Sequence, residues 1–293
     1  MQTTLPTGEG IRWPEGRQIA VLLTFDFDAD RLQAAYFGRE DLPFADRSRG
    51  LYGPDEGLPR LLNMLARQSV PATFFVPGVI CRRCPDQVKA IAAAGHEIAA
   101  HGDAHDSHGA LLSLEEARLD MERAEASIAA ITGKKPVGCR LPGGFQQSHT
   151  VDLLLERRYK YSSAINPAKC CDWAYCYERQ GKKQPLVEFS TDPMLEDLPY
   201  YFFTFVPPHH KASYNNAAVR EIWQDEFDGR RAEGDKFLCL KLHPALIGRA
   251  SRCKMLEELI VYMRENGAWF ASCETAADYV IAQNGLTGEG DAR

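Results

Sequence analysis

Two aspartates at the end of an apolar segment are the first residues whose spacing suggests chemistry. Asp26 and Asp28 alternate with Phe25 and Phe27 in the run TFDFDAD, residues 24–30. Side chains two apart on an extended chain lie on the same face, so both carboxylates point to one side. Carboxylates that leave a buried strand are costly unless a cation or hydrogen-bond donors meet them. The pair indicates a cation site; the alternative is a strand end that reaches solvent.

A histidine pair supplies the nitrogen ligands that such a site would need. His101 and His105 stand four apart in the segment HGDAH. Two imidazoles at this spacing can reach one ion, and with a carboxylate they form an open site of two nitrogens and one oxygen. A third histidine, His108, is expected to be an outer or surface residue. The acid pair and the histidine pair together favour a metal centre more strongly than either does alone.

Two further motifs place an arginine and a histidine at strand ends. Arg140 opens the segment RLPGG, and a guanidinium can hold a carboxylate ionised and oriented. The turn at residues 142–144 would let backbone N–H groups approach a ligand closely. His243 ends the apolar run of LKLHP, where Pro244 stops the strand. An ordinary turn and a structural histidine are the alternatives; the recurrence of polar groups after strands favours one shared site.

The elements that would position these motifs alternate between strands and helices. Such alternation predicts a parallel sheet covered by helices, and about seven units favour an α/β fold in the form of a closed or nearly closed barrel. Chemistry then gathers at the carboxyl ends of the strands. A long surface loop is expected over residues 167–185. The expected strands are residues 19–27, 72–76, 97–100, 137–141, 161–165, 186–189, 237–242 and 269–271.

Composition restricts the partners and the compartment. The chain has 293 residues, 45% of them hydrophobic, and a formal charge of −6, which argues against a nucleic-acid partner. We expect one domain over residues 1–293, with no signal peptide and no membrane span. Nine cysteines at irregular spacing are typical of reduced thiols in the cytoplasm. A structural zinc site at the cysteines is the alternative, formed by Cys81, Cys84, Cys170, Cys171 and Cys176.

The four motifs TFDFD, HGDAH, RLPGG and LKLHP, in this order, resemble those of the polysaccharide deacetylase (NodB-homology) superfamily. The likeness extends over roughly residues 11–280. The opening RWPEG, residues 12–16, is similar to an intracellular branch that contains cyclic imide hydrolases (imidases) and peptidoglycan deacetylase-like proteins. The resemblance implies a distorted (β/α) barrel of the NodB-homology type, a divalent metal, usually zinc, and a homo-oligomer, either a dimer or a tetramer.

The resemblance also implies a role for each motif residue. Two positions depart from the family pattern: Gly102 replaces a serine or threonine, and Gly143 replaces an aromatic residue that sugar-acting members carry. The implied roles are metal ligand for Asp28, His101 and His105, catalytic base for Asp26, support of that base for Arg140, and general acid for His243.

The expected activity is metal-dependent hydrolysis of a carbon–nitrogen amide bond by activated water. Since no export signal is seen, we expect a small cyclic imide whose ring is opened. Alternatives are an N-acetyl-sugar or peptidoglycan deacetylase, an allantoinase-like ureide hydrolase and a non-catalytic metal-binding scaffold. Gly143, Gly144 and Asp197 are the expected substrate-binding residues; Asp197 begins an acidic and aromatic segment that would line the pocket or a subunit contact, or pack in the core.

Overall fold

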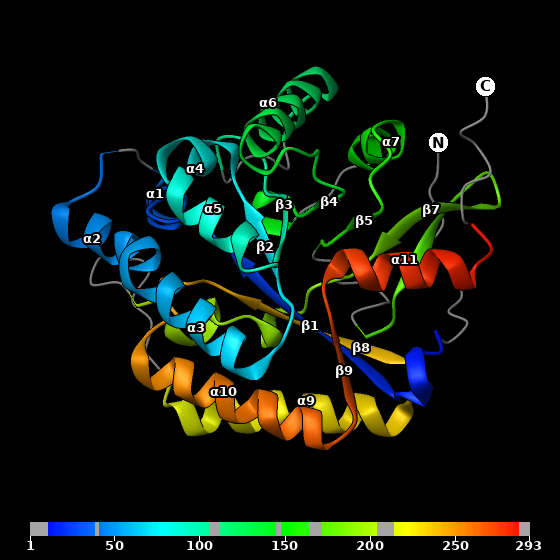
Figure 1. The fold of residues 1–293 in the computed structure, drawn as a ribbon. Coiled ribbons are helices and arrows are strands. Elements are labelled where there is room, and N and C mark those ends of the chain that lie inside the picture. The colour runs from blue at the N-terminus through cyan, green and yellow to red at the C-terminus, as the bar shows by residue number, and fades with distance from the viewer. Residues whose placement is uncertain are drawn as a thin grey trace.

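A curled β-sheet surrounded by helices forms the centre of the protein (Figure 1). The computed structural model describes residues 11–38, 41–105, 112–144, 148–164, 172–203 and 214–286. The sheet has nine strands: β1 (Ile19–Asp26), β2 (Thr73–Val76), β3 (Glu97–Ala100), β4 (Gly138–Cys139), β5 (Tyr161–Ser162), β6 (Tyr175–Arg179), β7 (Lys182–Glu188), β8 (Lys236–Leu242) and β9 (Ala268–Ala271).

The strand order is β6-β7-β5-β4-β3-β2-β1-β8, and β9 also pairs with β1. All pairs are parallel except β6 with β7. Within the described residues, β6 and β8 end the path without pairing to each other. The α/β class and the barrel-like curl are therefore confirmed, as a barrel that is incompletely closed.

Strand β1 is the hub of the sheet. One edge pairs with β8 from Ile19 to Phe25, while the other edge is shared between β9 and then β2. All eight residues of β1 are buried. This explains the continuous apolar run, because a parallel strand covered on both faces has no solvent side. The run ends at Asp26, which therefore emerges at the centre of the carboxyl edge of the sheet.

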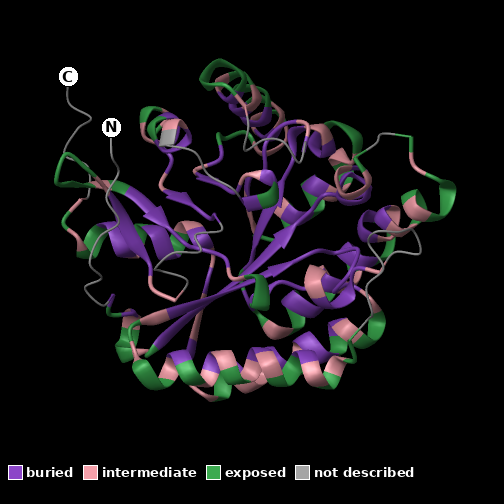
Figure 2. Ribbon diagram, turned by 180° about the vertical axis from the view of Figure 1, so that it is seen from behind, coloured by how far each residue is buried: buried purple, intermediate pink, exposed green. Residues whose placement is uncertain are grey.

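Helices cover the outside of the sheet. They are α1 (Arg31–Phe37), α2 (Phe44–Tyr52), α3 (Leu58–Gln68), α4 (Gly78–Arg83), α5 (Pro85–Ala93), α6 (Leu114–Thr132), α7 (Ser148–Glu156), α8 (Leu198–Tyr201), α9 (Asn216–Glu233), α10 (Ala250–Glu265) and α11 (Cys273–Gln283). Shorter turns are the 3₁₀ segments η1 (Pro14–Gly16), η4 (Pro142–Gly144) and η5 (Pro193–Leu195) and the π segment η2 (Gly53–Gly57). Figure 2 shows buried strands inside helices whose outer faces are exposed.

The core lies on both faces of the sheet. Val21 and Leu23 of β1 belong to the larger apolar cluster, beneath helices such as α3 and α10. Ala20 and Leu22 point the other way, into a smaller cluster that Trp13 and α11 help to close. This alternation follows from the two-residue period of a strand.

The prediction of a loop over residues 167–185 is wrong for most of the residues in this range that the structure describes. Strand β6 and the start of β7 form an antiparallel hairpin there. Its turn is Gln180-Gly181, and both residues have positive φ, 53° and 71°. Two-residue hairpin turns favour this conformation, and glycine adopts it readily. Pro185 concealed the hairpin, since proline is usually evidence against a strand.

No helix in the described part of the chain is long and apolar enough to cross a membrane.

Candidate active site

Three side chains that follow two strands of the sheet form a candidate metal site. The ligand atoms of Asp28, His101 and His105 all lie within 4.8 Å of one another. Nε2 of His101 is 3.6 Å from Oδ1 of Asp28, and Nε2 of His105 is 3.3 Å from Oδ2. Asp28 follows β1, and the histidines follow β3, next but one in the sheet. The arrangement matches the predicted ligand set.

The donor set fits a divalent cation. Oδ1 of Asp28 is buried with no hydrogen-bond partner in the described part of the chain. An uncompensated buried carboxylate oxygen is costly, and a cation would remove that cost. Nδ1 of His101 lies 2.6 Å from the carbonyl of Arg140, which can only accept. Nδ1 therefore carries the proton, and the lone pair on Nε2 faces Asp28. Burial lowers the pKa of His101 to about 4, so the ring is neutral, as a ligand must be.

Local backbone contacts fix the histidine loop. The N–H groups of Gly78 and Val79, at the start of α4, donate to the carbonyls of Gly102 and Asp103. Gly102 has φ +65°, and an added Cβ would lie 3.1 Å from the Asp120 carboxylate. The departure from serine or threonine at this position therefore has a steric and conformational reason.

Arg140 holds the carboxylate of Asp26. Nη1 donates to Oδ1 at 2.6 Å, and both groups are 1% exposed. The guanidinium also donates to Ser163 at 2.8 Å and to Thr24 at 3.0 Å, and it lies 4.0 Å from the centre of the Phe75 ring. Burial would raise the pKa of Asp26, but the positive charges around it, of which Arg140 contributes most, together hold that pKa well below its usual range. Asp26 is therefore an ionised proton acceptor.

His243 approaches the same point from β8. Its Nε2 lies 3.8 Å from Oδ2 of Asp28 and 4.0 Å from Oδ2 of Asp26. Behind it, Oδ1 of Asp197 lies 2.7 Å from Nδ1, and Oδ2 accepts from the backbone N–H of His243 at 2.9 Å. Burial would lower the pKa of His243, but Asp197, together with Asp26 and Asp28, outweighs it and raises that pKa to about 9. His243 is therefore a protonated donor.

The structure gives Asp197 a different place from the expected one. Its side chain is fully buried, and both oxygens contact His243, so it orients the imidazole ring. The other two expected substrate-binding residues, Gly143 and Gly144, lie in the turn η4 that follows β4, and both have positive φ. The N–H of Gly144 donates to the Leu141 carbonyl at 2.9 Å, so this group is already hydrogen-bonded within the turn.

An ion pair that the sequence interpretation missed lies beside Asp26. Nζ of Lys241 is 3.1 Å from Glu196 and 3.8 Å from Asp26, and all three side chains are buried. The signal was present in LKLHP, because Lys241 and His243 are two residues apart on one strand and share a face. Nothing in the sequence links Glu196 to Lys241, which is 45 positions away.

The remaining metal-site expectations concern cysteine and His108. The candidate cluster of Asp28, His101 and His105 is the one metal-like group found in the described ranges. Cys81 and Cys176 are buried free thiols whose pKa values are raised by burial. Cys170, Cys171 and His108 lie outside the described residues.

Comparison with known proteins agrees with this geometry. Residues 51–162 match the polysaccharide deacetylase family model. A peptidoglycan deacetylase of Helicobacter pylori is 29% identical over 90% of this chain and 97% of its own. A Mycobacterium smegmatis crystal structure, assigned as a polysaccharide deacetylase, is 32% identical with a TM-score of 0.86 over 99% of both chains. PuuE allantoinase has a TM-score of 0.81 over 96% of both chains at 23% identity, which shows a shared fold.

The motifs, the curled sheet and the full-length likeness lead to one assignment. The chain belongs to the polysaccharide deacetylase superfamily, whose members are metal-dependent hydrolases of non-peptide carbon–nitrogen bonds.

Proposed function

We propose that this protein opens small cyclic imides by hydrolysis of one carbon–nitrogen bond. The observation that carries the proposal is the enclosure of the reacting groups. Asp26, Asp28, His101, His105 and His243 are between 1% and 6% exposed. A polymer must lie across an open surface, whereas a small ring can be surrounded completely.

The chain's own residues can perform both proton transfers. A divalent ion at Asp28, His101 and His105, which we propose is zinc, would activate water and polarise the carbonyl. Asp26, kept ionised by Arg140, accepts the proton of the attacking water. His243, kept protonated by Asp197, donates a proton to the departing nitrogen, and the carbon–nitrogen bond breaks. No covalent intermediate with the protein is required.

The turn after Arg140 supports a substrate other than a sugar. Gly143 has no side chain to stack on a sugar ring, and its φ of 74° favours glycine. An imide nitrogen also leaves more easily than the nitrogen of a simple acetamide, which reduces the demand on His243. A cytoplasmic location would suit such a small substrate.

Deacetylation of an N-acetyl sugar is the second candidate. The H. pylori relative that matches nearly the whole chain is a peptidoglycan deacetylase, and the same two proton transfers would release acetate. An allantoinase-like activity has the weaker support of a structural likeness alone.

Direct comparison of substrates tests the proposal. Zinc-loaded protein is incubated with succinimide, allantoin or an acetylated chitooligosaccharide, and each product is followed by NMR. We expect succinimide to give its half-amide acid, and a chelator or Asp26→Asn to stop the reaction. Deacetylation of the oligosaccharide with succinimide left intact would favour the second candidate. Loss of neither compound would support a metal-binding scaffold.

A further inference from the structure

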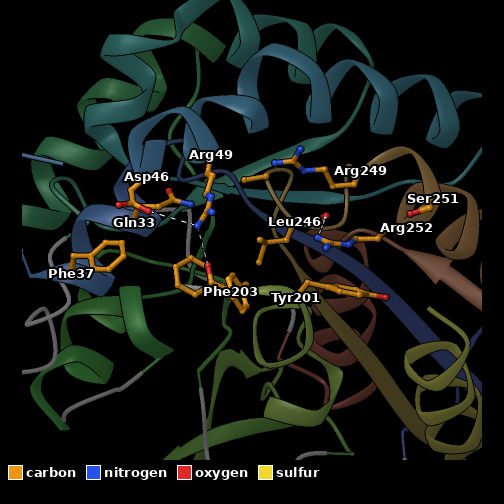
Figure 3. Close-up of a pocket in the computed structure, with 12 residues that line it drawn as sticks. Gln33, Phe37, Asp46, Arg49, Tyr201, Phe203, Leu246, Arg249, Ser251 and Arg252 are labelled. Atoms are coloured by element: carbon orange, nitrogen blue, oxygen red, sulfur yellow. Dashed lines mark hydrogen bonds and ion pairs between the residues drawn. The ribbon is translucent and has the colours of Figure 1, made fainter. Parts of the chain in front are cut away.

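A cavity of about 440 Å³ lies beside the catalytic groups and is not used in the reaction described above (Figure 3). Three of its walls continue directly from site residues. Gln33 and Phe37 come from α1, which begins three positions after Asp28. Tyr201 ends α8, which follows Asp197, and Leu246 donates its N–H to the carbonyl of His243 at 2.8 Å. The cavity therefore adjoins the side of the site from which His243 acts.

Two arginines give this cavity a positive charge. The guanidinium of Arg249 lies 3.6 Å from the centre of the Tyr52 ring, and that of Arg252 lies 4.1 Å from the centre of the Tyr201 ring. No carboxylate of the described residues lies within ion-pair distance of either group, while Arg49, on the opposite wall, pairs with Asp46 at 3.7 Å. Stacking fixes the two planes, and Arg252 also donates to the Leu246 carbonyl at 3.0 Å, but neither charge has a carboxylate counter-ion among the described residues.

The same wall is the start of a long helix. Arg249 is the N-cap of α10, which has 16 residues, and no side chain caps the helix. The first hydrogen bond of α10 runs from the Cys253 N–H to the Arg249 carbonyl, so the preceding N–H groups have no partner within the helix. Ser251, in this first turn, also lines the cavity. Partial positive charge at a helix N-terminus adds to that of the arginines.

A buried amide on the far wall points independently to a ligand. Gln33 is 3% exposed, and its Oε1 has no hydrogen-bond partner among the described residues. The amide packs against Gly50, where a Cβ would collide with it. Figure 3 shows Gln33 on the cavity wall beside Asp46 and Arg49. An acceptor buried without a partner is costly, and an N–H or O–H group of a ligand would satisfy it, whereas a carboxylate would be met by the arginines.

We infer that this cavity binds a carboxylate that the substrate carries beyond the departing nitrogen, so that the preferred substrates are anionic amides or imides. A carboxylate is planar and accepts two parallel N–H bonds from a guanidinium. The place of this carboxylate in the substrate follows from the proposed mechanism. His243 protonates the departing nitrogen, and the turn after His243 forms part of the cavity wall, so a group attached beyond that nitrogen would extend towards the cavity. The inference rests on the proposed function and specifies its substrate class.

Matched substrates test the inference. N-(carboxymethyl)succinimide is compared with N-isobutylsuccinimide, which has a similar shape without charge. N-acetylmuramic acid and N-acetylglucosamine form the corresponding pair if deacetylation is the activity observed. We expect kcat/KM to favour the charged member by at least about tenfold, the scale of a charge-assisted hydrogen bond. Arg252→Gln and Arg249→Gln should each reduce this preference, mainly through KM.

Lys254→Gln is the matched control, because Lys254 lies on the same helix with a side chain that is 79% exposed. It removes one positive charge and should leave the preference unchanged. A wild-type ratio near one, or a ratio that Arg252→Gln does not change, would overturn the inference while leaving the proposed hydrolysis intact.

Binding without turnover separates the two proposals. In the presence of a chelator, glutarate should raise the melting temperature of the wild type and of Lys254→Gln, but not that of Arg252→Gln. Absence of this shift in the wild type counts against the carboxylate site even if imides are hydrolysed. A shift in a protein that hydrolyses none of the substrates would keep the site and reject the proposed function.

Discussion

At the scale of single residues, each proposed proton-transfer group has one main partner of opposite charge among several charged neighbours. Arg140 contributes most to keeping Asp26 ionised, and Asp197 contributes most to keeping His243 protonated. The two pairs approach the candidate metal site from opposite sides of β1, because Arg140 follows β4 and His243 follows β8. The division into base and acid is therefore a consequence of which neighbour each group has.

Replacing Asp26 should separate metal binding from catalysis. In Asp26→Asn the ligands Asp28, His101 and His105 remain, so bound zinc should stay near one ion per chain. The rate should fall by at least ~100-fold, since the amide cannot accept the water proton. Elemental analysis and initial rates check both parts. His101→Ala should instead lose the ion, and near-normal turnover by Asp26→Asn would contradict the assigned role.

Replacing Asp197 should change the pH dependence. In the proposed mechanism His243 acts as an acid, so activity is present below its pKa and is lost as pH rises through it. Asp197 contributes most to raising that pKa, and without its carboxylate only Asp26 and Asp28 would oppose the lowering by burial. Asp197→Asn should therefore move the alkaline limb of kcat/KM to lower pH. Asp86→Asn, at a side chain that is 90% exposed, is the control. An unmoved limb would show that another group controls it.

At the scale of elements, close packing between short strands positions Arg140. Gly138 of β4 is in register with Tyr161 of β5, and a Cβ on Gly138 would overlap the Tyr161 ring. The Tyr161 hydroxyl donates to Glu97 at 2.7 Å on β3. The packing of β3, β4 and β5 against one another therefore requires a residue without a side chain at position 138.

Gly138→Ala should destabilise the fold by about 1–3 kcal/mol, the usual cost of overpacking, because the tyrosine must move. Urea unfolding measures the change. Gly229→Ala is the control: Gly229 lies within α9 with open space at its Cβ, and alanine there should stabilise the protein by up to ~1 kcal/mol. Equal stability of Gly138→Ala and the wild type would show that the tyrosine adapts without cost.

The sequence predicted long periodic elements and strand-end motifs well. Ser113 and Glu116 have the spacing of a capping box in the sequence and form one at the start of α6, and Gly133 ends that helix with φ 74°. The four motifs met at one point because parallel strands present their carboxyl ends at the same edge. The link from Asp197 to His243 was not predictable, since α8 has only four residues and the contact spans 46 positions. Helices α1 and α2 were also missed, because segments of seven and nine residues are too short to show a clear helical period.

At the scale of the whole molecule, the candidate metal site couples ion binding to stability. An ion that binds only the folded chain stabilises it by about 2.7 kcal/mol at a concentration 100-fold above its Kd. For a chain of this size, zinc should raise the melting temperature by about 4 °C. Differential scanning calorimetry with and without a chelator checks this. His101→Ala should abolish the shift, and His149→Ala should keep it.

The hub position of β1 has a consequence for synthesis on the ribosome. Its two edges are completed by β2, β8 and β9, and the last of these ends at Ala271. Asp26 and Asp28 are translated more than 200 residues before Lys241 and His243, their neighbours on and just after β8. A nascent chain released before β8 would leave one edge of β1 unpaired and Asp26 without Lys241 and His243. Activity should therefore arise only when almost the whole polypeptide has left the exit tunnel.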